Sequence, residues 1–189
     1  MKIISRKEFD KNKKELLLKI KKSVFIYPTD TIYGLGCDAH NSELVSRIRD
    51  LKGRYQRPFS IIAPSKKWIL DNCEVGNDAR VWVDKLPGHY TLILKLKHET
   101  VLAKEINPGL GTVGIRIPDN WFSEVVAQLG EPIVTTSVNI SGKPFMTSID
   151  NLDESIKNGV DFIFLNGKLT GKPSTLVFLD GKEVKVQER

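Results

Sequence analysis

Cationic side chains gather in one short segment of this sequence. Lys52, Arg54 and Arg57 lie within six residues, and Gly53 and Pro58 make the chain irregular there. Cations on a bent loop can converge on a polyphosphate, and arginine can bind phosphate oxygens through two parallel hydrogen bonds. The segment therefore predicts an anion site, although a cation-rich helix end can also serve only to complement the helix dipole.

Three further segments place polar side chains beside predicted strands. Hydroxyls and a carboxylate follow a short β-rich run in residues 27–36. Arg116 lies between two isoleucines at a strand end, so alternation puts it on one face, suited to binding a carboxylate. Ser137 and Asn139 share a face after an apolar strand start. Each pattern also occurs as plain turn or capping chemistry, and the residues alone indicate an anion-binding α/β protein that could bind a nucleotide.

The elements that must position these side chains alternate between helix and strand patterns. Helices are predicted over about 6–22, 42–51, 77–86, 120–129 and 150–158, with a short one from residue 65. Strands are predicted over 24–27, 59–63, 90–96, 113–117, 133–138, 162–165, 175–179 and 183–187. No repeat or composition break interrupts the chain, so we expect a single domain over 1–189, an α/β fold with a mixed sheet.

Composition and charge narrow the class of protein. The 189 residues are 40% hydrophobic and 28% charged, which is typical of a soluble globular protein. No apolar run is long enough to suggest a membrane span, and two cysteines without a CxxC pair favour a reducing, cytoplasmic setting. Residues 1–22 hold nine Lys or Arg and three acids, which accounts for the whole net charge of +6. This basic helix could contact tRNA or double-stranded RNA, or could be an ordinary solvated face.

Several familiar motifs are absent or misplaced. There is no P-loop, and the G-x-G-x-x-G match at 109–114 leads into a predicted strand where a dinucleotide-binding loop would open a helix. The three histidines show no metal-ligand spacing, so we expect no metal held by protein ligands alone.

Six segments together resemble the YrdC-like family of threonylcarbamoyl-AMP synthases. They are Y-P-T-D-T-I-Y-G-L-G-C-D-A, L-K-G-R, L-P-G-H-Y-T-L-I-L, G-I-R-I-P, T-S-V-N-I-S-G-K-P and P-S-T-L-V, and they extend from about residue 24 to residue 179. The resemblance implies a large twisted sheet of parallel and antiparallel strands, flanked by helices and enclosing a positively charged cavity.

The resemblance also implies roles for particular residues. Lys52 and Arg54 would be the catalytic cations. ATP or the adenylate would be bound by Lys52, Arg54, Arg57, Thr112, Ser137, Asn139 and Arg189, and L-threonine by Thr31, Arg116, Thr135 and Ser174. Tyr55, His89 and Phe145 depart from the residues that the family usually has at these places.

The implied reaction joins L-threonine, bicarbonate or CO2, and ATP with its Mg²⁺, into threonylcarbamoyl-AMP with release of pyrophosphate. A separate transferase would pass the threonylcarbamoyl group to the adenosine beside a tRNA anticodon. Two alternatives remain open: a YrdC-like paralogue that binds RNA without synthase activity, and a nucleotide-binding module that is not an enzyme.

Overall fold

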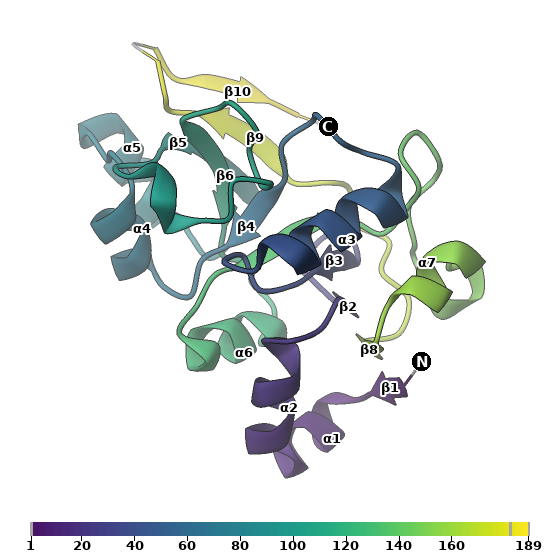
Figure 1. The fold of residues 1–189 in the computed structure, drawn as a ribbon. Helices are drawn as coiled ribbons and strands as arrows, with labels where there is room; N and C mark the ends of the chain where they lie inside the picture. Colours follow the sequence, from purple (N-terminus) through teal and green to yellow (C-terminus); the bar gives the residue numbers. More distant parts are fainter. Residues whose placement is uncertain (1, 182, 189) are drawn as a thin grey trace.

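One ten-stranded sheet forms the centre of the computed structural model, which describes residues 2–181 and 183–188 (Figure 1). The spatial order of the strands is β1-β8-β2-β3-β7-β4-β6-β5-β9-β10. Their bounds are β1 Lys2–Ile4, β2 Phe25–Tyr27, β3 Gly34–Gly36, β4 Ser60–Ile62, β5 Tyr90–Lys95, β6 Thr112–Arg116, β7 Ile133–Ser137, β8 Phe162–Phe164, β9 Thr175–Phe178 and β10 Lys185–Gln187. Parallel pairs such as β4–β6 and antiparallel pairs such as β4–β7 both occur, so the predicted mixed sheet is confirmed.

Helices lie on both faces of this sheet. Their bounds are α1 Arg6–Lys11, α2 Lys13–Ile20, α3 Ser42–Lys52, α4 Lys66–Asn72, α5 Asn77–Asp84, α6 Trp121–Leu129 and α7 Glu154–Gly159, with 3-10 turns at Glu99–Val101 and Ile149–Asn151. The apolar residues of α3, α4, α5 and α7 join one core cluster, and those of α1, α2 and α6 join another. None of the described helices combines the length and apolar composition that crossing a bilayer requires.

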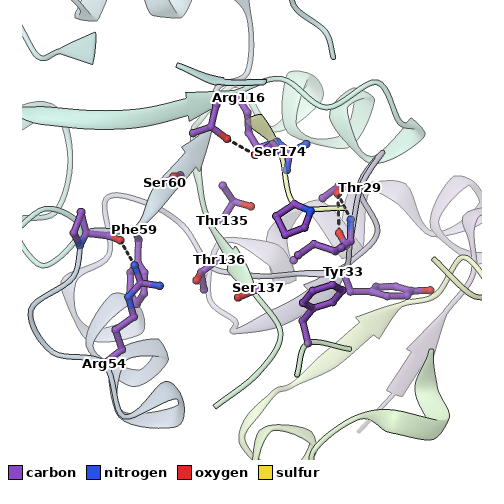
Figure 2. Close-up of a pocket in the computed structure, with 16 residues that line it drawn as sticks. Thr29, Tyr33, Arg54, Phe59, Ser60, Arg116, Thr135, Thr136, Ser137 and Ser174 are labelled. Atoms are coloured by element: carbon purple, nitrogen blue, oxygen red, sulfur yellow. Dashed lines mark hydrogen bonds between the residues drawn. The ribbon is translucent and has the colours of Figure 1, made fainter. Parts of the chain in front are cut away.

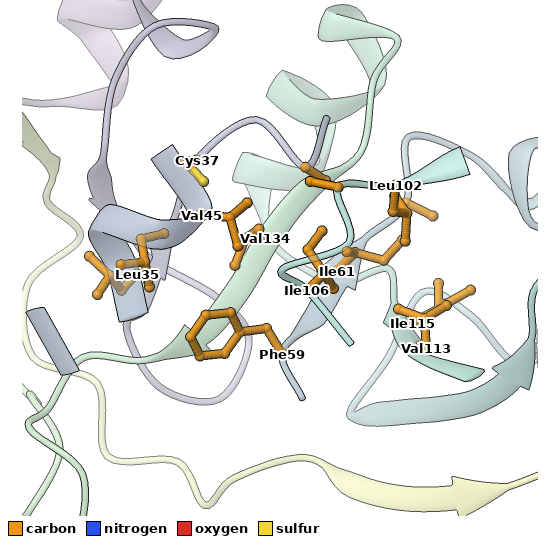
Figure 3. Packing of buried hydrophobic residues seen from close by; sticks show 14 of the residues in the cluster. Leu35, Cys37, Val45, Phe59, Ile61, Leu102, Ile106, Val113, Ile115 and Val134 are labelled. Atoms are coloured by element: carbon orange, nitrogen blue, oxygen red, sulfur yellow. The ribbon is translucent and has the colours of Figure 1, made fainter. Parts of the chain in front are cut away.

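Strand alternation explains why there are two cores. On β6, Val113 and Ile115 face the larger core, shown in Figure 3, with Val134 of β7 and Ile61 of β4. The next residue of β4, Ile62, faces the opposite way and packs in the second core. That second core is rich in aromatic rings, which pack against one another from α6 and from strands β2 and β8.

Several local predictions differ from the structure. Strand β1 is not among the predicted strands, and the helix predicted over 150–158 is a 3-10 turn followed by α7. The capping box of Ser5 and Glu8 starts a helix as expected, but the predicted helix over 6–22 is interrupted at Asn12, whose φ of −116° and ψ of 27° leave the helical region. Asparagine side chains compete for backbone hydrogen bonds, and here the Asn12 amide donates to the carbonyl of Glu8. The basic segment is therefore two short helices, α1 and α2.

Strand β3 is also missing from the strands that the sequence predicts. Its outer residues, Gly34 and Gly36, carry no side chain that could show alternation, and glycine is uncommon in strands. The structure gives the reason for both glycines, because a Cβ atom at either position would lie 2.8 Å or less from the ring of Tyr27. The Tyr27 ring therefore occupies the space that a side chain at either glycine would need. Strand β3 pairs with β2 on one side and with β7 on the other.

Candidate active site

A cavity of about 190 Å³ opens on the face of the sheet that carries the second core (Figure 2). Residues from the ends of β3, β4, β5, β6 and β7 line it, together with Arg54, Pro58 and the 173–174 segment. The cavity gathers four of the segments that the sequence marks out, although they lie far apart along the chain.

The same strands build the second core and the cavity in succession. Ile62 of β4 pairs with Ile133 of β7, and both pack in the second core. Ser60 precedes Ile62 by two residues on β4, and it pairs with Thr135, which follows Ile133 by two residues on β7. Both Ser60 and Thr135 lie on the same face and line the cavity. The apolar-to-polar change along each strand therefore sets where the core ends and the cavity begins.

Arg116 is almost completely buried at the cavity wall. Its Nη2 donates to Asp30 Oδ1, and its Nη1 donates to Thr31 Oγ1 at 3.2 Å. Its Nε has no hydrogen-bond acceptor among the described residues. Burial lowers the pKa of Arg116 and the Asp30 charge opposes that effect, yet a guanidinium remains charged at any ordinary pH. Arg116 therefore keeps N–H donors beyond these two hydrogen bonds, because Nε has no acceptor among the described residues and each Nη nitrogen carries a second N–H.

Hydroxyl groups surround this arginine. Thr29 and Thr31 share a hydrogen bond of 2.9 Å between their Oγ1 atoms. Ser174, which lies beside Arg116 in Figure 2, has its Oγ 2.6 Å from Thr91 Oγ1, and both residues are buried. Thr135 also lines the cavity, so this side offers several hydroxyl groups to a small polar ligand.

Arg54 lines the cavity from the loop that follows α3. Its Nη2 donates to the carbonyl of Pro58 at 2.7 Å, and its guanidinium carbon lies 5.3 Å from the centre of the Phe59 ring. Figure 2 shows Arg54 and Arg116 at well separated places around the cavity. The net charge of the cavity stays a prediction, with Arg54 and Arg116 as its lining cations.

Lys52 lies behind the cavity wall. It is 1% exposed, and its Nζ donates to the carbonyls of Ser137 and Asn139 and to Asn139 Oδ1. Ser137 Oγ in turn donates to Asn139 Oδ1 at 2.6 Å. Burial, and next the charge of Arg54, lower the pKa of Lys52 to about 7. In this structure Lys52 joins the end of α3 to the segment after β7.

The predicted site residues divide into those that line the cavity and those that do not. Arg57 is exposed, and its carbonyl accepts a hydrogen bond from Arg49. Thr112 starts β6 on the face of Arg116, four residues before it. Of the predicted set, Arg54, Arg116, Thr135, Ser137 and Ser174 line the cavity. Thr31 reaches this group through Arg116, Asn139 through Ser137, and Arg189 lies outside the described residues.

Sequence reasoning did not assign Asp30 and Thr91 to the site. Both lie in segments that it singled out, but a carboxylate inside an anion site is unexpected until its partner Arg116 is known. Thr91 follows Tyr90 in a strand whose apolar alternation draws attention to the leucines. The only available signal was that both residues are polar and adjacent to predicted strand ends.

Comparison with known proteins shows the family of this chain. Residues 19–189 match the Sua5_yciO_yrdC family, which carries the description "Telomere recombination". A Methanocaldococcus jannaschii protein with the provisional name threonylcarbamoyl-AMP synthase is 34% identical over 95% of this chain and 88% of its own length. The Escherichia coli protein YciO, which is named as uncharacterized, is 33% identical over 89% of this chain and 84% of its own length.

A solved structure agrees with these sequence relatives. Pyrococcus abyssi Sua5 complexed with L-threonine superposes with a TM-score of 0.87 at 27% identity, covering 98% of this chain and 56% of that chain. The mouse threonylcarbamoyl-AMP synthase is 34% identical over 70% of this chain, and the match covers 47% of its length. This chain thus spans about half the length of these two proteins, and it belongs to the Sua5–YciO–YrdC family.

Proposed function

We propose that this protein makes L-threonylcarbamoyl-AMP from L-threonine, bicarbonate or CO2, and ATP, and that it releases pyrophosphate. The observation that carries the proposal is that Arg54 and Arg116, from distant segments, line one cavity together with Thr135, Ser137 and Ser174. Two separated cations suit two anionic groups, a polyphosphate and an amino-acid carboxylate. Two relatives that carry the name threonylcarbamoyl-AMP synthase, one of them provisionally, support the same reaction.

Threonine would bind at the Arg116 end of the cavity. The Arg116 guanidinium can donate to the carboxylate, because each Nη nitrogen carries a second N–H beyond the one that donates to Asp30 or Thr31, and Nε has no acceptor among the described residues. The hydroxyls of Thr31, Thr135 and Ser174 would bind the amine and the side-chain hydroxyl. The L-threonine complex of the P. abyssi relative supports this class of ligand.

ATP would bind with its phosphates toward Arg54. Ser137 also lines the cavity, and its hydrogen bonds with Lys52 and Asn139 hold Ser137 in place. Arg57, Thr112 and Arg189 belong to the proposed nucleotide set on the strength of the sequence resemblance. No carboxylate is among the lining residues, and no three His, Cys, Asp or Glu in the described ranges lie together as a metal site. Mg²⁺ would therefore arrive bound by ATP phosphate oxygens, as is usual for this ion.

The reaction needs positioning more than a side-chain nucleophile. The threonine amine adds to CO2 and loses a proton, which gives N-carboxythreonine. A carbamate oxygen then attacks the α-phosphorus of ATP, the bond to the β-phosphate oxygen breaks, and pyrophosphate leaves. Arg54 would stabilise the negative charge that builds on the phosphate oxygens, and Arg116 would hold the threonine in line.

The cellular context is part of the same proposal. The product would pass to a separate transferase that modifies the adenosine beside a tRNA anticodon, and we propose that the protein works in the cytoplasm. The basic face of α1 and α2 is the part of the chain with which tRNA could make contact.

Pyrophosphate release tests the proposal directly. Purified protein with ATP, Mg²⁺, bicarbonate and L-threonine should release pyrophosphate, and omitting threonine should stop the release. Arg54→Ala should reduce turnover by roughly a hundredfold, since it removes a cation that acts on the developing charge. Lys67→Ala, at an exposed ion pair with Asp71, is the matched control and should leave turnover unchanged. Pyrophosphate release that does not depend on threonine would refute the synthase.

A paralogue that binds RNA without making the adenylate is the second candidate. The nine Lys or Arg of residues 1–22 favour it, because a basic surface can bind nucleic-acid phosphates. Binding of tRNA or duplex RNA that weakens steeply with salt, in a protein that releases no pyrophosphate, would favour this alternative.

A further inference from the structure

Arg49 is a buried cation that lies close to the cavity but is not one of its lining residues. It is 5% exposed, and it occupies the last turn of α3. Its guanidinium lies over the Phe59 ring, with 4.5 Å from its carbon to the ring centre. Arg54 lies near the same ring, at 5.3 Å. The two arginines therefore share one aromatic side chain, and only Arg54 reaches the cavity.

The hydrogen bonds of Arg49 go to the main chain of two separate loops. Nε donates to the carbonyl of Glu105 at 2.7 Å, and Nη2 donates to that of Ile106 at 3.3 Å. Nη1 donates to the carbonyls of Arg54 at 2.8 Å and Arg57 at 3.2 Å. Burying a charge is costly, and it lowers the pKa of Arg49, while the charge of Glu105 opposes that effect. Within the described residues, all the hydrogen bonds of the guanidinium nevertheless go to main-chain carbonyls.

Arg49 forms hydrogen bonds with both main-chain polar groups of Arg54. The main-chain N–H of Arg54 donates to the carbonyl of Arg49 at 3.0 Å, and the carbonyl of Arg54 accepts from Arg49 Nη1 at 2.8 Å. Gly53 makes this return possible, because its φ of 58° reverses the chain directly after the helix. The backbone of Arg54 is thus clamped on both sides by one residue, while its side chain extends to the cavity.

We propose that Arg49 is the positioning residue that holds Arg54 at the phosphate end of the cavity, by clamping the 53–58 loop against the 105–106 segment. This inference rests on the proposed function, in which Arg54 binds the ATP phosphates. An arginine is required because its planar group presents five N–H donors in a fixed fork that reaches four carbonyls. A lysine would keep the charge, but its single nitrogen has three donors and could not bond all four carbonyls.

Calorimetric affinities for ATP and for L-threonine test the clamp without requiring turnover. Arg49→Lys should raise the dissociation constant for ATP by about tenfold or more, since small displacements of a positioned group carry large costs. The dissociation constant for L-threonine, which depends on Arg116, should remain within about twofold of the wild type. Arg49→Met, which loses the fork entirely, should show the same split.

The control variant is Arg47→Lys on the same helix. Arg47 is partly exposed, and its guanidinium bonds Asp161 and the carbonyl of Gly159. Both affinities should remain at wild-type values in this variant. A double-mutant cycle adds a second criterion, because Arg49→Lys should weaken ATP binding little further when Arg54 is already alanine.

Each outcome separates the clamp from the proposed function. The clamp proposal would be overturned by an ATP affinity that is unchanged in Arg49→Lys, or by equal losses of affinity for ATP and L-threonine. It would also be overturned if the effects of Arg49→Lys and Arg54→Ala on ATP affinity were fully additive. The absence of a cooperative melt in both Arg49 variants would overturn it as well, because the residue would then be structural. A wild-type protein that binds both ligands but releases no pyrophosphate would refute the synthase alone, and one that binds no ATP would refute both.

Discussion

Arg116 and Asp30 form an ion pair in which the two side chains are only 7% and 3% exposed. Asp30 also accepts a hydrogen bond of 3.0 Å from the main-chain N–H of Asp119, and His89 Nε2 lies 3.6 Å from the same carboxylate. A buried pair of this kind adds little net stability by itself, but removing one partner leaves the other charge uncompensated. We therefore expect the Asp30 carboxylate to compensate the buried charge of Arg116 when no ligand is bound.

Asp30→Asn should destabilise the protein. The substitution keeps the size of the side chain and removes its charge, so we expect a loss of about 3 kcal/mol in the free energy of unfolding. That corresponds to a fall of roughly 10 °C in melting temperature for a chain of this size. Asp71→Asn, which breaks the exposed pair with Lys67, is the control and should change the melting temperature little. Equal melting temperatures for Asp30→Asn and the wild type would show that the buried pair is not needed.

Arg116→Lys should weaken threonine binding selectively. A lysine ammonium cannot contact Asp30, Thr31 and a ligand carboxylate in the geometry that the guanidinium provides. We expect the dissociation constant for L-threonine to rise by roughly tenfold or more and that for ATP to stay within about twofold. L-threoninol, which lacks the carboxylate, supplies the control ligand. If the variant prefers threonine over threoninol as strongly as the wild type does, Arg116 does not bind the carboxylate.

Lys52 should make the stability of the protein depend on pH. Burial and the charge of Arg54 lower its pKa from 10.5 to about 7, whereas the unfolded chain keeps the ordinary pKa. Between these two values the unfolded state binds more protons, so the free energy of unfolding contributed by this residue rises with pH. Below about pH 7 the lysine is protonated in both states, and this dependence vanishes.

Denaturant unfolding of Lys52→Met across this pH window measures the effect. The stability of the wild type relative to the variant should grow as pH rises from about 7 to about 9. Lys11→Met, at an exposed position on α1, should give a curve parallel to that of the wild type. Parallel curves for Lys52→Met as well would mean that the Lys52 pKa is not lowered in the folded protein.

Thr91→Val should affect the threonine end of the cavity. The substitution keeps the branched shape but removes the hydroxyl that lies 2.6 Å from Ser174 Oγ. Loss of one buried hydrogen bond costs about 1 kcal/mol, so we expect a severalfold weaker affinity for L-threonine and little change for ATP. Thr100→Val, at an exposed position in the 3-10 turn Glu99–Val101, is the matched control. A threonine affinity equal to that of the wild type would remove Thr91 from the site.

The strands with a clear apolar alternation were predictable from the sequence, and so was the helix that carries Lys52. Strand β6 and helix α3 lie within one or two residues of their predicted bounds, because their buried side chains recur with the strand and helix periods. Strand β3 and the break at Asn12 were not predictable in this way. Gly34 and Gly36 are explained by the Tyr27 ring, and that contact exists only after β2 and β3 have paired.

The sequence by itself determined which kinds of group the predicted site contains: guanidiniums, a lysine, and a set of hydroxyls from segments far apart in the chain. Only the tertiary structure decided which of them face the cavity. Lys52 and Arg54 are two residues apart, yet one lies behind the wall and the other lines it, because α3 ends between them at Gly53. Asp30 and Arg116 are 86 residues apart and meet because β3, β7, β4 and β6 lie side by side. Local patterns reflect the burial of single elements, whereas such partnerships depend on the order in which distant strands pair.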